Sequence, residues 1–253
     1  MQYRTIDDLL QSYPRRRPPL SPRHQETYVQ HYRSNRSGAS RLQRKVVQLE
    51  SWMHRRVAAH SAGARVLELG AGTLNHLPYH PQAIEYDAVE PFRELWQDSP
   101  NLPRVNRLFL ELAEVPPDRP YDSILSVAVL EHLTDLPAIL ARSGLLLTTG
   151  GRFCAGFPSE GGLLWGLAWR LTTGVKYRWD HGLDYGSIMR HEHLNTAGEI
   201  VRLLRHFFDT VSLSRFPAGL HNLSFYTAAV AGAPKRALCE RFLAGRETSA
   251  VPV

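Results

Sequence analysis

From residue 64 onward, short apolar runs alternate with segments whose apolar residues follow a helical period. Apolar runs bounded by turn residues predict strands. The predicted strands are residues 65–69, 84–90, 105–110, 121–127 and 151–157, with two later ones at 210–215 and 223–231. Helices are predicted after Gly72, Pro91, Asp135 and Thr196. Because strands that alternate with helices form mostly parallel sheets covered on both faces, we expect one α/β, Rossmann-like domain with a seven-stranded sheet.

The segments that flank this pattern differ from it. Across residues 41–60, apolar residues recur at steps of three and four, which predicts an amphipathic helix with the stripe Leu42, Val46, Leu49, Met53 and Val57. Residues 1–40 form an arm whose stretch 14–23 is too rich in proline for a helix interior, so we expect it to be extended or disordered. The arm is either a linker or a lid that guides the substrate. We divide the chain into arm and helix (1–60), main domain (61–232) and C-terminal tail (233–253).

A long insertion, residues 158–195, separates the fifth strand from the next helix. It is rich in tryptophan, tyrosine and arginine, and its apolar residues at 163–171 indicate a short helix. A loop of this length is usually functional, so we interpret it as a cap over the substrate cleft. Alternatively, its aromatic residues only form the core of the cap. The candidate substrate-binding residues, here and before the last strand, are Glu160, Trp165, Trp169, Arg170, Tyr185, Arg190, His221 and Asn222.

The strongest motif is Val66-Leu67-Glu68-Leu69-Gly70-Ala71-Gly72-Thr73, in which an apolar strand enters a glycine-rich turn. Such turns lie at the carboxyl end of the sheet, where ligands bind. Glu90 ends the next strand, and a carboxylate at that place can accept hydrogen bonds from ribose hydroxyls. The dinucleotide fingerprint requires a third glycine where this chain has Asn75. The glycines could also be plain turn residues, and Glu90 could complement the dipole of a helix that starts near Pro91.

These residues resemble the class I S-adenosylmethionine (SAM)-dependent methyltransferases. The similar pieces are residues 68–72, 90–92 and 121–124, the last leading to Val129-Leu130-Glu131-His132-Leu133, and the resemblance spans roughly residues 60–230. It implies SAM as cofactor, S-adenosylhomocysteine (SAH) as product, and residues 130–132 near the methyl group. The implied cofactor-binding residues are Glu68, Gly70, Ala71, Gly72, Thr73, Asn75, Glu90, Pro91, Phe92, Glu111, Val129 and Leu130. Glu111 stands for an aspartate that many members carry after the third strand.

The candidates for acid–base catalysis are His191, Glu192 and His193, together with His132. Methylation of a hydroxyl requires removal of its proton, and histidine titrates near neutral pH. The cluster could instead be a polar network beside the next helix, or bind a metal together with Asp184 or Glu160, although we expect no metal. His132 could merely cap or pack. Thr196 and Glu199 have the spacing of a capping box, which needs no functional explanation.

Composition narrows the function further. The two cysteines exclude a disulfide framework, and we find neither a signal peptide nor a membrane span, so we expect a cytoplasmic protein. The net charge of +6 would suit a polyanion, but the basic residues are scattered, and the fourth strand lacks the Pro-Pro motif of enzymes that methylate base amines.

We therefore expect a methyltransferase that acts on a heteroatom of a small molecule or glycan unit. Residues 182–186 and 189–193 are similar to methyltransferases of surface-polysaccharide and secondary-metabolite pathways. The alternatives are a non-catalytic SAM-binding partner subunit, an RNA methyltransferase, and an NAD-linked oxidoreductase or epimerase. The oligomeric state is left open.

Overall fold

The computed structural model describes residues 3–27, 41–81 and 83–249, with the backbone alone for 41–49 and 247–249. Within these residues the centre is a seven-stranded sheet in the order β3-β2-β1-β4-β5-β7-β6. The strands are β1 (Arg65–Leu69), β2 (Glu85–Val89), β3 (Arg107–Phe109), β4 (Tyr121–Val127), β5 (Leu147–Pro158), β6 (Phe208–Pro217) and β7 (Ser224–Pro234). Neighbouring strands are parallel except β7, which runs antiparallel to β5 and β6. The predicted Rossmann-like fold is confirmed.

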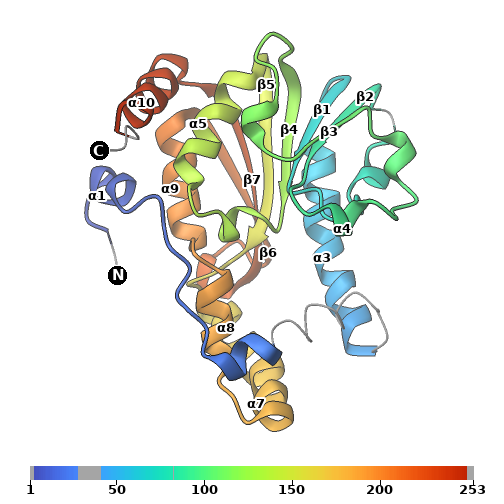
Figure 1. The fold of residues 1–253 in the computed structure, drawn as a ribbon, viewed down its shortest axis with the longest axis vertical. Helices are drawn as coiled ribbons and strands as arrows, with labels where there is room; N and C mark the ends of the chain where they lie inside the picture. Colours follow the sequence, from blue (N-terminus) through green and yellow to red (C-terminus); the bar gives the residue numbers. More distant parts are fainter. Residues whose placement is uncertain (1–2, 28–40, 82, 250–253) are drawn as a thin grey trace.

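Alternating side chains of the strands build a core on each face of the sheet. In β4, Ile124 packs into the larger core with residues of α5 (Leu136–Leu146) and α9 (Ala197–Phe207). The next residue, Leu125, points the opposite way and packs with Val57 of α3 (Arg41–His60). Figure 1 shows α5 and α9 on one side of the sheet and α3 on the other. In the predicted stripe of α3, Met53 and Val57 are buried, whereas the side chains of Leu42, Val46 and Leu49 lie outside the described part.

One predicted helix is wrong. The chain after Gly72 forms turns and the short 3₁₀ helix η2 (Leu77–Tyr79) in place of an α-helix. Pro78 and Pro81 remove backbone donors there, and Leu74 takes a positive φ of 62°, which an α-helix does not allow. The helix after Pro91 is short, α4 (Arg93–Trp96), and those after Asp135 and Thr196 are α5 and α9. Thr196 and Glu199 form the expected capping box.

The arm contains more structure than its proline content indicates. Helix α1 (Ile6–Gln11) starts with a capping box between Thr5 and Asp8. Residues 22–27 are also helical, and Pro22 is compatible with this helix because it lies in the first turn, where proline is tolerated. The extended prediction therefore fails at residues 22 and 23, whereas residues 15–21 have no helix or strand. The arm is fixed to the domain, since the Tyr13 hydroxyl donates to Asn195 Oδ1 at 2.6 Å and Arg15 pairs with Glu199 at 2.8 Å.

The insertion after β5 is almost entirely helical. It forms α6 (Leu163–Trp169), the π-helical segment η6 (Arg170–Gly174), α7 (Val175–His181) and α8 (Tyr185–Glu192). Because β5 ends at Pro158, this segment extends from the carboxyl end of the sheet, and Figure 1 shows α7 at the end of the molecule farthest from the strands. At the C-terminal side, α10 (Arg236–Ser249) packs on α5, so most of the predicted tail is a docked helix. No helix among the described residues is both long enough and apolar enough to cross a bilayer.

Candidate active site

The glycine turn after β1 is closely held by its neighbours. Gly70 and Gly72 have positive φ angles of 66° and 51°, which non-glycine residues rarely adopt. The Gly70 N–H donates to Val89 O at 2.8 Å. A Cβ atom on Gly70 would lie 2.5 Å from Cγ2 of Val129, so a side chain does not fit there. The turn therefore lies between the end of β2 and the loop that follows β4.

Glu90 connects this turn to the end of β2. Its carboxylate accepts hydrogen bonds from Gly72 N at 2.8 Å and from Phe92 N at 3.0 Å. A carboxylate has about four acceptor sites, so roughly half of them remain for a ligand. Phe92, next to it, is half exposed. Glu90 thus orders the turn and keeps acceptor capacity at the place predicted for the ribose.

Glu68 supports the turn from inside the sheet. It is buried and accepts a hydrogen bond from the Tyr86 hydroxyl at 2.7 Å. Burial raises the pKa of Glu68 to about 8, although the hydrogen bond from Tyr86 opposes the shift. The contribution of Glu68 to cofactor binding stays a prediction.

The remaining predicted cofactor residues surround the turn. Ala71 and Leu130 are buried, whereas Thr73, Asn75 and Pro91 are exposed. Glu111 is exposed as well and caps η4 (Leu112–Glu114) through a reciprocal bond with Glu114. The role of Glu111 in cofactor binding stays a prediction.

A polar cluster forms where η5 (Leu130–His132) meets the end of α8. The His132 Nδ1 atom lies 2.9 Å from Glu192 O, and the rings of His132 and His193 meet edge to face at 5.0 Å. Burial lowers the pKa of His132, but the hydrogen bond to Glu192 and the nearby Glu131 charge outweigh burial and raise it above the usual value. Three of the four predicted catalytic residues therefore lie together.

Within this cluster, His193 has the geometry of an oriented base. Its Nδ1 atom lies 2.9 Å from Oε2 of Glu160, which also accepts a hydrogen bond from Trp165 Nε1. The indole of Trp165 stacks on the His193 ring with a centroid distance of 6.4 Å. Because a carboxylate only accepts, we assign the imidazole proton to Nδ1, and Nε2 then carries the lone pair. Nε2 has no hydrogen-bond partner among the described residues.

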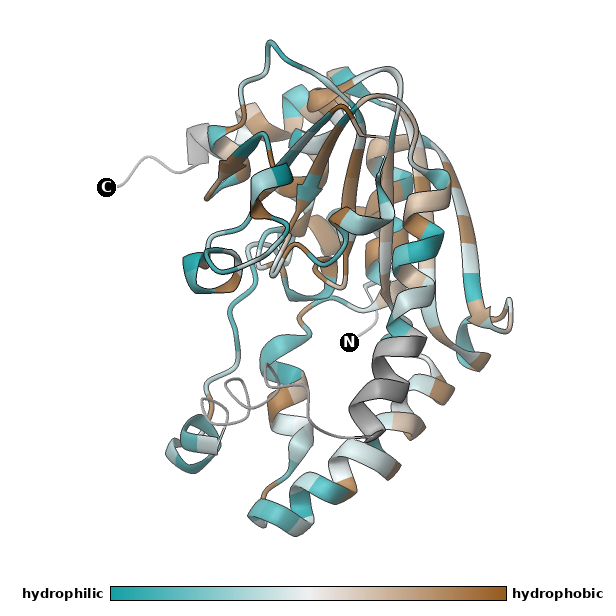
Figure 2. Cartoon of the chain, turned by 90° about the vertical axis from the view of Figure 1, so that its right-hand side faces the viewer, coloured by the Kyte–Doolittle hydropathy of each residue, from teal (hydrophilic) through white to brown (hydrophobic). Residues whose placement is uncertain are grey.

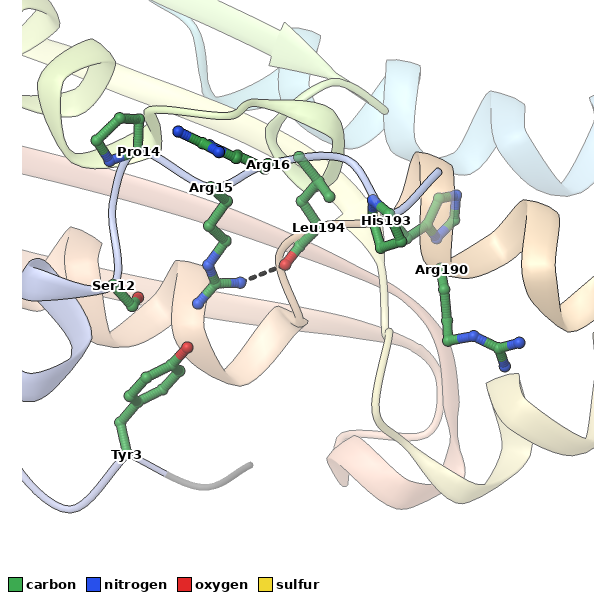
Figure 3. A pocket seen from close by; sticks show the side chains of 9 residues that line it. Tyr3, Ser12, Pro14, Arg15, Arg16, Arg190, His193 and Leu194 are labelled. Atoms are coloured by element: carbon green, nitrogen blue, oxygen red, sulfur yellow. Dashed lines mark hydrogen bonds between the residues drawn. The ribbon is translucent and has the colours of Figure 1, made fainter. Parts of the chain in front are cut away.

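His191 points to the N-terminal arm instead. Its Nδ1 atom lies 2.8 Å from Pro18 O, and Arg17 donates to the carbonyl oxygens of His191 and His132 at 3.0 and 3.1 Å. Figure 3 shows the pocket, of about 420 Å³, between the arm and the end of α8, with His193 on its wall and Arg15 bonded to Leu194 O. The lining residues are Tyr3, Ser12, Pro14, Arg15, Arg16, Pro18, Arg190, His193 and Leu194.

Three of the predicted substrate residues, Trp169, Arg170 and Tyr185, line a second cavity in the cap, of about 220 Å³. There the rings of Trp169 and Tyr185 are 6.0 Å apart, and the Arg170 guanidinium lies 4.5 Å from the Trp169 ring centroid. Arg190 contacts Ser187 and Asp184 on α8 and its N-cap. His221 and Asn222 belong to η7 (His221–Leu223), which packs against α6. The predicted substrate set is thus spread over two cavities and the loop before β7.

Two side chains near the cluster, Glu50 and Tyr226, were not predicted, whereas Glu131 was expected only as part of the segment 130–132 near the methyl group. The Oε2 atom of Glu131 is buried and has no hydrogen-bond partner in the described structure. Glu50, on α3, has its pKa raised by burial and by the charge of Glu131. Tyr226, on β7, lies 5.9 Å from the ring of Trp165, and burial followed by the charge of Glu50 raises its pKa. Only Glu131, within the resembling motif, carried a signal in the sequence. The described residues contain no group of three or more His, Cys, Asp or Glu arranged to hold a metal ion.

Comparison with known proteins supports the same fold. A SAM-dependent methyltransferase from Thermotoga maritima, described as a possible histamine N-methyltransferase, has a TM-score of 0.52 and 17% identity, covering 74% of this chain and 96% of its own. A SAM-dependent methyltransferase from Archaeoglobus fulgidus has a TM-score of 0.54 and 14% identity, covering 74% and 93%. The N-methyltransferase NodS from Bradyrhizobium japonicum, in complex with SAH, has a TM-score of 0.52 and 13% identity, covering 79% and 91%.

A search of curated protein sequences finds no match to the chain. The family model described as "Methyltransferase domain" matches residues 39–207, which include α3, the glycine turn, Glu90, the polar cluster and the cap. The chain belongs to this methyltransferase family, and its fold is that of the class I SAM-dependent methyltransferases.

Proposed function

We propose that the protein transfers the methyl group of SAM to an oxygen or nitrogen atom of a small molecule or glycan unit. The observation that carries this proposal is the contact between the glycine turn and the polar cluster. Gly70 abuts Val129, the residue directly before η5, and η5 bears Glu131 and His132. A ligand on the turn therefore lies beside the residues that can handle the acceptor's proton.

The residues at the turn fit SAM. Nothing lies within 4 Å of a Cβ built on Gly72, so this side of the turn is open to a ligand. Glu90 has acceptor sites left for the ribose hydroxyls, and Phe92 offers an exposed ring to the adenine. Glu131 adds a buried carboxylate oxygen without a hydrogen-bond donor in the described chain, and such a charge attracts a cation in a medium of low dielectric constant.

Bound SAM supplies a methyl group on a positively charged sulfur. Glu160 holds the proton on Nδ1 of His193 and directs Nε2 toward the acceptor. Nε2 would take the proton of the acceptor's O–H or N–H group as the acceptor receives the methyl group that SAM would supply. Most of the acceleration comes from holding the two reactants in line, which the cap and the arm accomplish from two sides.

The acceptor class is inferred from the walls of the site. Trp165 lies between His193 and Tyr226 and provides a rigid apolar surface with a polar edge. Flat groups and sugar rings can stack on such a surface. Similar folds occur in N-methyltransferases and in an O-methyltransferase family protein, so the fold itself leaves the acceptor atom open. The similarity of residues 182–186 and 189–193 to enzymes of surface-polysaccharide and secondary-metabolite pathways supports an acceptor from such a pathway.

Calorimetric titration with SAM, SAH and NADH tests the cofactor assignment. We expect saturable binding of SAM and SAH, and binding roughly tenfold to a hundredfold weaker in Glu90→Ala, because hydrogen bonds to a charged group are lost. The exposed Glu94, on α4, gives the control Glu94→Ala, which should bind as the wild type does. Binding of NADH in place of SAM would overturn the proposal.

Methyl transfer from labelled SAM to a panel of phenols, sugars and amines tests the base. We expect His193→Ala to bind SAM normally and to lose about 10²–10⁴-fold in turnover. The matched control is His191→Ala, because His191 contacts the arm and should lose much less. Equal losses in the two variants would mean that His193 is not the base.

A further inference from the structure

The outer side of the cap carries a ridge of exposed apolar side chains. Leu163, Leu167, Leu171, Val175 and Trp179 follow one another at steps of four along α6, η6 and α7. Leu171 is 70% exposed and Trp179 is 88% exposed. Single exposed apolar residues are common, but a contiguous row of them marks an interaction surface.

The π-helical segment keeps this row on one side. In an α-helix of 3.6 residues per turn, residues four apart drift by about 40° at each step, so five such residues would wind far around the axis. A π-helical turn contains more than four residues and rotates the row back, and η6 (Arg170–Gly174) lies in the middle of the segment. Figure 2 shows single hydrophobic residues, in brown, among hydrophilic ones along the helices that project from the sheet.

The inner side of the same segment is occupied by the cap's own packing. Trp165 contacts His193 and Tyr226, Trp169 contacts Tyr185, and Tyr177 is buried. The ridge is therefore not needed to close the cap, and the core of the domain does not cover it.

Basic residues accompany the ridge. Residues 163–181 contain Arg170, Lys176 and Arg178 but only one acid, Asp180. Two of these cations, Arg170 and Arg178, line the 220 Å³ cavity next to Val175, which has one acid, Asp184, in its wall. An apolar face bordered by lysine, arginine and tryptophan is typical of helices that lie in the interface of a membrane.

We propose that the α6–α7 segment docks on the surface of an anionic lipid bilayer. The ridge enters the boundary between headgroups and acyl chains, and Arg170 and Arg178 bind lipid phosphates. Charge favours this partner over a second copy, because two facing ridges would bring the same arginines together. Since α7 projects farthest from the sheet, a flat surface reaches it without touching the strands (Figure 1). The inference does not depend on the proposed methyl transfer.

Co-sedimentation with vesicles tests the docking. We expect the wild-type protein to pellet with vesicles that contain phosphatidylglycerol and much less with phosphatidylcholine alone. The double variant Leu171→Ser, Trp179→Ser should stay in the supernatant with an unchanged unfolding temperature, because both side chains are exposed. The matched control is Ile84→Ser, which alters a side chain that is 76% exposed but lies just before β2.

Two further measurements keep the proposal falsifiable. The double variant Arg170→Gln, Arg178→Gln should bind anionic vesicles about tenfold more weakly, because each cation near the surface contributes to binding. Anionic vesicles should shift the tryptophan emission to the blue in the wild type, with a smaller shift in Trp179→Phe. The proposal fails if the wild-type protein binds neither kind of vesicle. It also fails if sedimentation velocity shows self-association that the Leu171→Ser, Trp179→Ser variant abolishes.

Discussion

The two glycines of the turn after β1, Gly70 and Gly72, should differ in how much stability is lost when each is replaced by alanine. Both Gly70 and Gly72 have a positive φ, so alanine at either position costs about 1–2 kcal/mol of backbone strain. Only at Gly70 does the new Cβ meet another side chain, since it would lie 2.5 and 2.7 Å from the two γ carbons of Val129. A Cβ atom on Gly72 would have no atom of another part of the chain within 4 Å.

The size of the difference follows from these distances. Carbon atoms in ordinary contact are about 3.5–4.0 Å apart, so Val129 has to move by about 1 Å. Overpacking of this kind costs about 1–3 kcal/mol. We therefore expect Gly72→Ala to lower the free energy of unfolding by about 1–2 kcal/mol and Gly70→Ala by about 2–5 kcal/mol.

Urea unfolding followed by circular dichroism measures both values, and a double variant isolates the contact. Val129→Ala removes the γ carbons, so adding it to Gly70→Ala should recover about 1–3 kcal/mol while the strain from φ persists. The same addition to Gly72→Ala should recover nothing. If Gly70→Ala and Gly72→Ala cost the same, or if Val129→Ala rescues neither, then the contact between the turn and the loop after β4 does not constrain this site.

Three further predictions concern stability. Burial raises the pKa of Glu68 from 4.5 to about 8, so between these pH values the folded protein binds a proton that the unfolded chain does not. The stability that Glu68 contributes is therefore complete below about pH 4.5 and falls by up to about 1.4 kcal/mol per pH unit as the pH rises toward 8. Urea titrations at several pH values should show a flatter slope in Glu68→Gln. Tyr13→Phe leaves the buried Oδ1 of Asn195 without its donor and should cost about 1–3 kcal/mol, whereas an unchanged midpoint of thermal unfolding would show that the arm adds no stability there. Thr196→Ala removes the N-cap of α9 and should cost about 0.5–2 kcal/mol by the same measurement, and a stability equal to that of the wild type would contradict the capping role.

The interior of the sheet could be predicted from the sequence because its strands are buried on both sides. Strands β1 and β4 begin and end at the predicted residues. Polar residues on both sides of an apolar run mark where a buried strand starts and stops. At one edge of the sheet, β3 is shorter than predicted and pairs only with β2. The missed helix α1 carried a local signal, since Thr5 and Asp8 have the spacing of a capping box.

The place of the glycine turn and of its neighbours could also be predicted, because these residues follow the carboxyl ends of successive strands. The parallel pairing of β1 with β2 and β4 brings Gly70, Glu90 and Val129 together without any information beyond strand order. Glu50 could not be found in this way. Its place near Glu131 depends on how α3 packs across the opposite face of the sheet, which no local pattern encodes.

The different surroundings of His191 and His193 could not be predicted from the sequence. In a helix, residues two apart point about 200° away from each other, so both rings could not face one cleft if α8 continued. The helix ends at Glu192, and His193, as its C-cap, has φ −93° and ψ 90°, which sets its ring direction independently of the helix. What then fixes each ring is a distant partner: Pro18 of the arm for His191, and Glu160, just after β5, for His193. The carboxylate of Glu160 orients the His193 ring with Nδ1 as the donor and leaves Nε2 open, so the partner, and not the position in the motif, is the reason why we propose His193 as the base.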